Sequence, residues 1–337
     1  MTIKTLGLIF IFLCVGPLNA QTRLTKLVPL NVNPNTITVS GVSAGGFMAV
    51  QMHVALSSVF KGAASVAGGV YWCAQGNAMT AQMNCMRSPS VLNVDTFLGK
   101  AKSDEAANKI EKLENIKRSR VFIFAAKNDT IVHPGNSDKL YEFYSKLTPK
   151  ANIKYKSDVP SGHSWITNRY GTRCGTQTSP WITNCNYDLA GDILTFFYGK
   201  LNSPKSTVPD MKRQMFTFDQ NEFQTRTSSL FPTGFIYIPK SCQAAPRGGA
   251  CHLHVNFHGC QMGPNYLNDQ YVSNTGLNEW AEINNIIVLY PQAANSVFSN
   301  PYGCWDWFGY TGSDYVNKNG PQIIAIQKMV YRILGKY

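Results

Sequence analysis

The sequence predicts an α/β protein built on a mainly parallel β-sheet with helices on both faces. Two observations lead to this prediction. In the first half, short runs rich in β-branched and aromatic residues alternate with apolar or amphipathic segments long enough to form helices. The second half adds three strand-like runs, then a helix, a further buried strand and a closing helix. Strands that alternate with helices are typical of parallel sheets covered on both sides.

The elements of the first half follow from local composition. The run TITVSGV is β-branched and predicts a buried strand, and the segment after it is apolar on most faces, which predicts a buried helix. Turn residues such as Lys-Asn-Asp separate later elements. The predicted strands are residues 36–42, 120–126 and 152–157, and the predicted helices are residues 45–58, 137–147 and 187–199.

The second half reads as a continuation of the same sheet. A polar, proline-containing connection at residues 200–210 precedes it, and the sequence holds no internal repeat. We therefore expect residues 21–337 to form a single domain. The predicted strands are residues 214–218, 234–239, 252–259 and 286–291, and the predicted helices are residues 278–285 and 321–334.

Composition excludes several classes of protein. Apolar residues make up 44% of the 337 residues and charged residues only 15%, which excludes an intrinsically disordered chain.

The net charge is +12, but the densest basic stretch, residues 109–120, also carries Glu111 and Glu114 at helical spacing. We interpret it as a solvated helix face and expect no nucleic-acid partner. No interior apolar run reaches the roughly 20 residues of a membrane span, so we expect no membrane-spanning helix in the mature chain. We also expect a monomer.

Residues 1–20 have the layout of a secretory signal peptide. Lys4 gives a positive start, residues 6–15 form an unbroken apolar run, and Ala20 supplies the small residue of a cleavage site. We expect cleavage after Ala20 and a secreted or periplasmic protein. A lipoprotein modified at Cys14 is the alternative, and the lack of small residues before that cysteine disfavours it.

The cysteines also indicate export. Without Cys14 an even number remains, as expected of disulfides formed in an oxidising compartment. Zinc is disfavoured because the sequence has no Cys-x-x-Cys pair, so we expect no metal site. Many pairings are open, and proximity in sequence favours Cys73–Cys85, Cys174–Cys185, Cys242–Cys251 and Cys260–Cys304.

The most informative local pattern is Gly-x-Ser-x-Gly at residues 41–45, between a predicted strand and a predicted helix. Small residues permit a sharp turn that exposes Ser43 at the carboxyl end of the strand. The helix behind it directs free N–H groups at any anion that forms there. We predict that Ser43 is a nucleophile. The alternative is a glycine-rich turn with a capping serine.

A serine nucleophile needs a base and an orienting carboxylate. His163 lies in a short Gly/Ser loop after a predicted strand, and Asp129 follows another buried strand. The order Ser43, Asp129, His163 is the one expected of α/β-hydrolases. Asp158 is the competing acid, but nothing in its polar loop would bury it.

Ester hydrolysis also needs two N–H donors for the oxyanion. We predict the backbone N–H groups of Ala44 and of Cys260, which lies in the loop FHGCQ. In the usual α/β-hydrolase order the His-Gly strand precedes the nucleophile strand, but here it lies far downstream of Ser43. We therefore predict a circularly permuted α/β-hydrolase fold, with the usual termini at the connection 200–210.

Several long segments together carry a resemblance to a known family. These segments are residues 41–69, 160–165, 184–194, 256–261, 286–293 and 303–312. Through them the chain resembles the exported poly(3-hydroxybutyrate) depolymerases, most of all the circularly permuted, single-domain type known from a fungus.

The resemblance implies a serine esterase that acts on short-side-chain polyesters or their oligomers without a cofactor. It implies the same roles for Ser43, Asp129 and His163, and it places Trp307 or Trp305 in the substrate crevice. We expect neither the linker nor the substrate-binding domain that many members append, so adsorption to polymer would fall to exposed apolar residues around the crevice. The rival functions are a feruloyl or acetylxylan-type carboxylesterase on this scaffold and a non-catalytic binding protein with a relic triad.

Overall fold

The computed structural model describes residues 26–205, 211–243 and 249–337. The expected signal peptide, and residues 206–210 of the connection between the two halves, lie outside this range. The strands of the main sheet are β1 (Thr38–Val42), β2 (Gly62–Val66), β3 (Arg120–Phe124), β4 (Ile153–Lys156), β8 (Met215–Asp219), β9 (Thr233–Tyr237), β10 (His252–Phe257) and β11 (Ile286–Tyr290).

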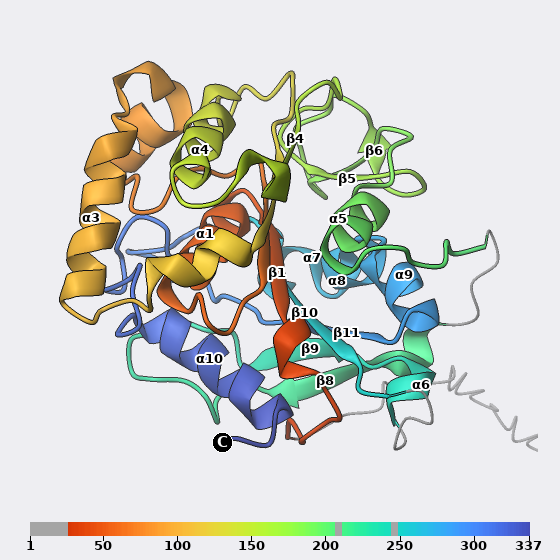
Figure 1. Cartoon of the computed structure of the whole chain (residues 1–337). Coiled ribbons are helices and arrows are strands. Elements are labelled where there is room, and N and C mark those ends of the chain that lie inside the picture. The colour runs from red at the N-terminus through yellow and green to blue at the C-terminus, as the bar shows by residue number, and fades with distance from the viewer. Residues whose placement is uncertain (1–25, 206–210, 244–248) are drawn as a thin grey trace, which may run out of the picture.

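Strands from both halves of the chain share one eight-stranded sheet, as the sequence predicts (Figure 1). The order across the sheet is β4-β3-β2-β1-β10-β11-β9-β8. The pairs from β4 to β11 are parallel, and β9 is antiparallel to both of its neighbours. The carboxyl ends of the parallel strands therefore meet at one edge, where open α/β sheets bind their ligands.

Alternate strand residues point into two apolar cores, one on each face of the sheet. In β3, Val121 and Ile123 join one core, while Phe122 and Phe124 join the other. Helices cover both faces, as predicted. The first core includes residues of α1 (Ala44–Ala55), α3 (Val94–Ala106), α4 (Gly135–Ser145) and α10 (Pro321–Ile333), and the second includes residues of α5 (Leu189–Tyr198), α7 (Pro264–Leu267), α8 (Gln270–Asn274) and α9 (Leu277–Ile283).

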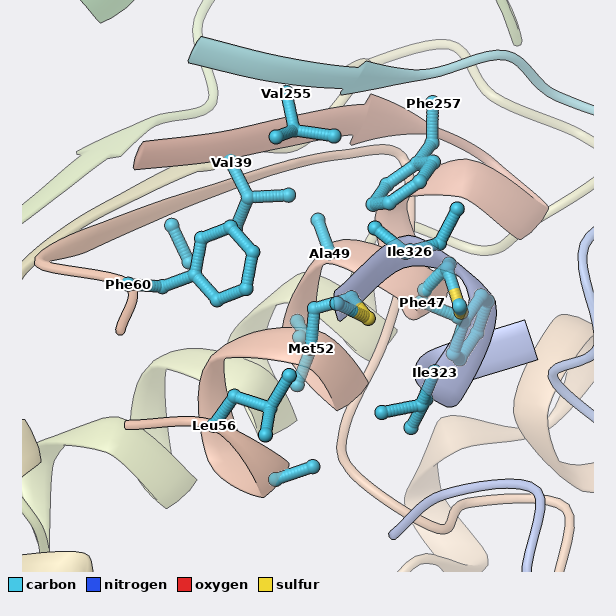
Figure 2. Packing of buried hydrophobic residues seen from close by; sticks show 14 of the residues in the cluster. Val39, Phe47, Ala49, Met52, Leu56, Phe60, Val255, Phe257, Ile323 and Ile326 are labelled. Atoms are coloured by element: carbon cyan, nitrogen blue, oxygen red, sulfur yellow. The ribbon is translucent and has the colours of Figure 1, made fainter. Parts of the chain in front are cut away.

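Helix α1 lies wholly inside the molecule. All of its residues are buried, and they pack between Val39 and Val255 of the sheet and Ile323 of α10 (Figure 2). A helix that is apolar on every side is stable only where every side is covered. This packing fixes the first turn of α1 relative to the sheet, and the serine predicted as nucleophile immediately precedes that turn.

The topology supports the predicted permutation. β1 is the first strand of the described chain, yet it pairs with β10, with Gly41 opposite Phe257. If the strands are counted from β8 onward and β1 follows β11, the sheet runs in sequential order except that β10 and β11 exchange places. The two ends of the described chain also meet, because the N–H of Leu30 donates to the carbonyl of Ile333 at 2.8 Å.

Several elements differ from the sequence prediction. The segment 109–120 is not an α-helix but an irregular stretch followed by the 3₁₀ helix η4 (Leu113–Arg118). The reason is visible in its buried residues: Ile110, Leu113 and Ile116 recur every third position, the period of a 3₁₀ helix. Strand β2 went unpredicted because its Gly-Ala-Ala-Ser-Val sequence lacks the bulk that marks a strand.

The remaining elements are short. A second, three-stranded sheet in the order β5-β7-β6 was not predicted either. Within the described residues no helix is long and apolar enough to cross a membrane. The short elements are β5 (Trp165–Thr167), β6 (Thr172–Arg173), β7 (Ile182–Asn184), α2 (Ala78–Thr80), α6 (Lys240–Gln243), the π-helix η2 (Ala81–Arg87) and the 3₁₀ helices η1 (Pro34–Thr36), η3 (Pro89–Val91), η5 (Lys150–Asn152) and η6 (Met211–Gln214).

Four disulfide bonds cross-link the fold. The structure joins the eight cysteines in the local pairs that sequence proximity favours. Disulfides of this kind persist in oxidising compartments and stabilise mainly by restricting the unfolded chain. The four bonds are Cys73–Cys85, Cys174–Cys185, Cys242–Cys251 and Cys260–Cys304.

Three buried histidines have depressed pKa values. Burial lowers the pKa of His53 and of His254 to about 3, and that of His258 to about 4. In the unfolded chain each of these groups takes up a proton near pH 6.5. Below that pH the unfolded state therefore binds more protons than the folded state, and stability falls as the pH drops.

We predict that the free energy of unfolding decreases by up to about 6 kcal/mol between pH 6.5 and 5, since each such group contributes about 1.4 kcal/mol per pH unit in this window. Guanidinium unfolding of the disulfide-intact protein at several pH values measures it. His254→Gln removes one of the three groups and should reduce the slope by about a third. A free energy of unfolding that is constant across this range would contradict the prediction.

Candidate active site

Ser43 stands at a strained turn between β1 and α1. Its φ of 56° and ψ of −124° lie in a region that non-glycine residues rarely occupy, and such strain is concentrated at functional sites. The turn needs glycine on both sides. A Cβ on Gly41 would lie 2.2 Å from the carbonyl oxygen of Gly45, and a Cβ on Gly45 would lie 2.3 Å from that of Phe257. The Gly-x-Ser-x-Gly pattern is thus required by close backbone approach.

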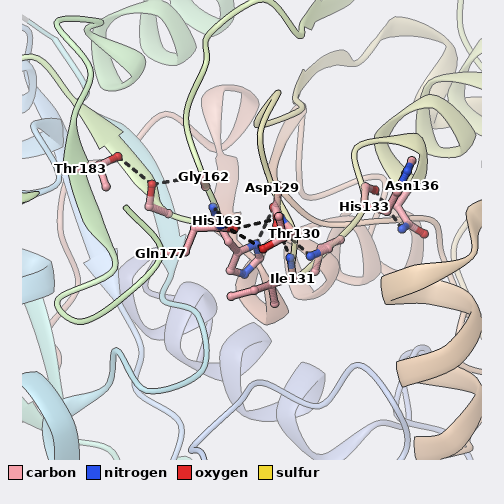
Figure 3. A network of polar contacts seen from close by, with 11 residues as sticks. Asp129, Thr130, Ile131, His133, Asn136, Gly162, His163, Gln177 and Thr183 are labelled. Atoms are coloured by element: carbon pink, nitrogen blue, oxygen red, sulfur yellow. Dashed lines mark hydrogen bonds and ion pairs between the residues drawn. The ribbon is translucent and has the colours of Figure 1, made fainter. Parts of the chain in front are cut away.

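Asp129 and His163 lie on the loops that follow β3 and β4, and they meet at the carboxyl edge of the sheet (Figure 3). His163 Nδ1 is 2.6 Å from Asp129 Oδ2, and both side chains are buried. The other carboxylate oxygen, Oδ1, accepts the N–H groups of Ile131 and Val132, each at 2.8 Å. With Nδ1–H donating to the carboxylate, His163 Nε2 is left free to accept a proton.

Ser43 and His163 line the same cleft, which has a volume of about 580 Å³. No hydrogen bond joins the Ser43 hydroxyl to the His163 imidazole as the structure stands. Catalytic hydrogen bonds are often long or absent without substrate and tighten in the complex. The cleft can therefore bring a nucleophile and a base to one bound carbonyl group.

The two residues predicted to bind an oxyanion, Ala44 and Cys260, line this cleft from separate segments of the chain. Ala44 is the first residue of α1, so its N–H has no partner within the helix. Cys260 also lines the cleft, and Gly259 before it lies against Ser43, since a Cβ on Gly259 would be 3.2 Å from the Ser43 Cβ. The two residues predicted to supply N–H donors thus line one cleft together with Ser43.

His258 holds the Cys260 amide in its orientation. Its Nε2 accepts the N–H of Ala293 at 3.2 Å, so its Nδ1 carries the proton and donates to the carbonyl of Gly259 at 2.7 Å. That carbonyl and the Cys260 N–H belong to one trans peptide and point in opposite directions. Fixing the carbonyl on the buried imidazole directs the N–H away from His258. The lowered pKa keeps this ring neutral, as the arrangement requires.

The structure distinguishes the two crevice tryptophans. Trp307 lines the cleft and stacks on Phe47 of α1, with 4.6 Å between ring centroids. Trp305 is fully buried, packs against Phe257 and does not line the cleft. Trp305 belongs to the buried core and not to the cleft lining, so the expectation that Trp305 touches substrate does not fit the structure.

Asp158, the competing acid, and two other histidines that could have served as the base are occupied elsewhere. Asp158 is exposed and pairs with Lys156 at 2.9 Å, so it does not orient His163. His254 is buried between Thr38 and Ser40, and His133 Nδ1 accepts the N–H of Gly135. His163 alone among these histidines faces the cleft with Ser43.

Gln177 was not anticipated from the sequence. Its side-chain oxygen accepts the N–H of His163 at 3.1 Å and the N–H of Thr130 at 3.0 Å, and its Nε2 donates to Thr130 Oγ1 (Figure 3). It thereby ties the loop of Asp129 to the loop of His163. Gln177 lies in the loop closed by the Cys174–Cys185 disulfide. The predicted pairing of these two cysteines is the one feature of the sequence that indicates a fixed shape for this loop.

We predict that Gln177→Ala lowers kcat about 10-fold and changes KM little, because it frees both loops without touching the cleft lining. Gln177→Glu retains an acceptor for both N–H groups and should stay within about threefold of the wild type. Steady-state kinetics on a soluble ester measures both variants. Equal losses for the two substitutions would show that the bridge through the side-chain oxygen does not position His163.

Comparison with known proteins agrees with this geometry. A profile of the prolyl oligopeptidase family (Peptidase_S9) matches residues 27–186. A poly(3-hydroxybutyrate) depolymerase of Delftia acidovorans is 40% identical over 323 residues, which are 95% of this chain and 63% of that protein. This chain therefore spans less than two thirds of that relative. A polyhydroxybutyrate depolymerase of Talaromyces funiculosus is 35% identical over 332 residues, 94% of this chain and 95% of that protein.

The chain belongs to the polyhydroxybutyrate depolymerase family. The crystal structure of a PHB depolymerase from Penicillium funiculosum is similar with a TM-score of 0.84 and 34% identity, covering 93% of this chain and all of that one. A PHB depolymerase complexed with an R3HB trimer has the same TM-score at 33% identity and the same coverage. The predictions of family membership and of an α/β-hydrolase fold are confirmed.

Proposed function

We propose that this chain is an exported serine esterase that hydrolyses poly(3-hydroxybutyrate) or its oligomers through an acyl-enzyme. One observation carries the proposal: a strained serine at a helix N-terminus shares a cleft with a histidine bonded to a buried carboxylate, in a chain of this family. Serine, base and orienting acid are the parts that nucleophilic catalysis of ester cleavage requires.

In the first half of the reaction, Ser43 Oγ attacks the ester carbonyl carbon while His163 Nε2 takes the hydroxyl proton. The carbonyl oxygen becomes an oxyanion, which the N–H groups of Ala44 and Cys260 stabilise. As the intermediate collapses, the carbon–oxygen bond to the leaving alcohol breaks and His163 donates its proton to that oxygen. Asp129 holds the imidazole in the required tautomer and stabilises its transient positive charge.

The second half releases the acid. Water attacks the acyl-enzyme carbonyl while His163 accepts one of its protons, and the same two N–H groups hold the oxyanion. Collapse then breaks the bond to Ser43 Oγ, which recovers its proton from His163. The reaction consumes one water molecule per ester bond and requires no other reactant.

The cleft walls suit an aliphatic polyester. Apolar side chains from separate segments form much of the lining, among them Phe47, Ile131, Val132, Met262 and Trp307. Methyl and methylene groups of hydroxybutyrate units gain free energy by leaving water against such surfaces, about 0.8 kcal/mol per buried CH₂.

Exposed apolar residues lie beside both rims of this cleft. Phe298 is 98% exposed and Val297 is 81% exposed, next to the cleft residues 299–302, while Met79 is 74% exposed between cleft residues of η2 and α2. We propose that they adsorb to the polymer surface, as expected if no separate binding domain does so.

We predict that the double variant V297S/F298S adsorbs at least 10-fold less to amorphous polymer but hydrolyses a soluble trimer at the wild-type rate. Ile283→Ser, an exposed apolar residue on α9, is the matched control and should leave both properties unchanged. Depletion of protein from a polymer suspension measures adsorption. Undiminished adsorption of the double variant would assign this role to other residues.

A substrate panel tests the function itself. The wild type should clear an amorphous polyhydroxybutyrate suspension and hydrolyse hydroxybutyrate oligomers faster than a feruloyl ester or acetylated xylan. Preferential release of ferulate or acetate would instead support the rival carboxylesterase function. Absence of turnover on all these esters, together with no labelling by a fluorophosphonate, would support a non-catalytic binding protein.

We propose that the protein is exported because its four disulfides would persist in an oxidising compartment but not in the reducing cytoplasm. Whether the leader directs the chain to the periplasm or to the medium is tested by fractionating an expressing culture. Processing is tested by the mass of the mature chain, which should begin at Gln21.

A further inference from the structure

Arg87 is the single permanently charged side chain among the described residues that line the active-site cleft. It ends η2, is exposed to solvent, and has no ion-pair or hydrogen-bond partner in the described part of the chain. Other lining residues are apolar or uncharged and polar, apart from the histidine of the proposed triad. A free guanidinium in such a cleft favours an anionic ligand, since no neighbouring carboxylate neutralises it.

Contacts of the chain on either side place Arg87 on one wall of the cleft. The carbonyl of Met86 accepts the N–H of His133 at 2.7 Å, and Pro89 lies against Gly135. Both contacts fasten this segment to the loop that begins at Asp129. Ile131 and Val132 of that loop line the cleft as well. Arg87 therefore shares the wall that carries the proposed acid and base.

The proposed oxyanion donors lie on other segments of the cleft lining. Cys260 is joined by a disulfide to Cys304, close to Trp307, and all three line the cleft. In the proposed reaction the leaving alcohol takes its proton from His163, so the alcohol portion of the substrate lies toward the wall of His163. Arg87 is on that side.

In an oligomer of a hydroxy acid, the alcohol portion of each ester leads toward the free carboxylate end of the chain. We propose that Arg87 binds this terminal carboxylate and so directs cleavage to ester bonds near the carboxyl end of soluble oligomers. The proposal rests on the proposed function and adds to it a subsite for an aliphatic carboxylate. A guanidinium matches a carboxylate with two parallel N–H···O bonds.

The test compares one substrate with and without its charge. Hydrolysis of the (R)-3-hydroxybutyrate trimer is measured as the free acid and as its methyl ester, with the wild type, Arg87→Gln and the control Arg118→Gln. Arg118 is exposed on η4 and does not line the cleft, so this control removes the same net charge elsewhere. For Arg87→Gln we expect kcat/KM on the free acid to fall about 10- to 50-fold, while the methyl ester changes less than twofold.

The dependence of turnover on salt supplies a second measurement. Added salt should weaken wild-type turnover of the free acid more than that of the methyl ester, and Arg87→Gln should abolish this difference. Equal losses on the two trimers, or no loss on either, would overturn the assignment of Arg87 and leave the proposed function intact. Wild-type protein that hydrolyses neither trimer would contradict the proposed function itself.

Discussion

Replacing Ser43 with alanine is expected to lower kcat for ester hydrolysis on the order of 10⁴- to 10⁶-fold, because it removes the atom that attacks the carbonyl. Substrate binding should persist, since the cleft walls and the N–H groups of Ala44 and Cys260 are unchanged. Steady-state kinetics on a soluble hydroxybutyrate trimer measures the first effect, and equilibrium binding of the same trimer measures the second.

A matched control separates this loss from damage to the fold. Ser58 follows the end of α1, is exposed and does not line the cleft, so Ser58→Ala should leave kcat within about twofold of the wild type. Substantial residual activity in Ser43→Ala, beyond contamination by wild-type protein, would show that another group attacks the ester.

The second large effect is expected from Asp129→Asn, which should lower kcat on the order of 10⁴-fold with little change in stability. The reason lies in the hydrogen bonds of this carboxylate. The amide oxygen of asparagine can keep the N–H groups of Ile131 and Val132, which turns its NH₂ group toward His163 Nδ1. Nδ1 must then accept, the proton moves to Nε2, and the ring can no longer take a proton from Ser43.

Asp158→Asn is the control for this substitution. Asp158 is the other carboxylate near His163 in sequence, but it is exposed and paired with Lys156, so kcat should stay within about twofold. Kinetics on the trimer measures both variants, and thermal unfolding reports on stability. If Asp158→Asn lost activity and Asp129→Asn kept it, the identity of the orienting acid would be wrong.

The parts of the fold that the sequence predicts are those with a strong local signal. β1, β3, β10 and β11 are rich in β-branched or aromatic residues, and α1 and α10 are long and apolar where they pack, so composition alone places them within a few residues. The sequence does not predict β2 because alanine and glycine carry no strand signal. In the sheet, β2 lies between β1 and β3 and pairs with a neighbouring strand along both of its edges. Its pairing is a tertiary effect that no local pattern records.

The site divides in the same way. The strained turn at Ser43 is predictable because it requires glycines at fixed spacing, and the pairing of His163 with Asp129 because the chain order limits the candidates. The catalytic roles of the three residues are the proposal made above. Gln177 and Arg87 were not predictable, since a half-buried glutamine and an exposed arginine have no sequence signature. Their positions depend on how the loop after β6 and the end of η2 fold against the loop that starts at Asp129.

Covalent labelling by a fluorophosphonate, mapped by peptide mass spectrometry, tests the convergence of the three side chains most directly. The account predicts one label per chain, on Ser43, at a rate that falls at least about 10³-fold in His163→Ala, because the hydroxyl is then no longer activated. Labelling at a different residue, or labelling of Ser43 at the same rate with and without the imidazole, would contradict it.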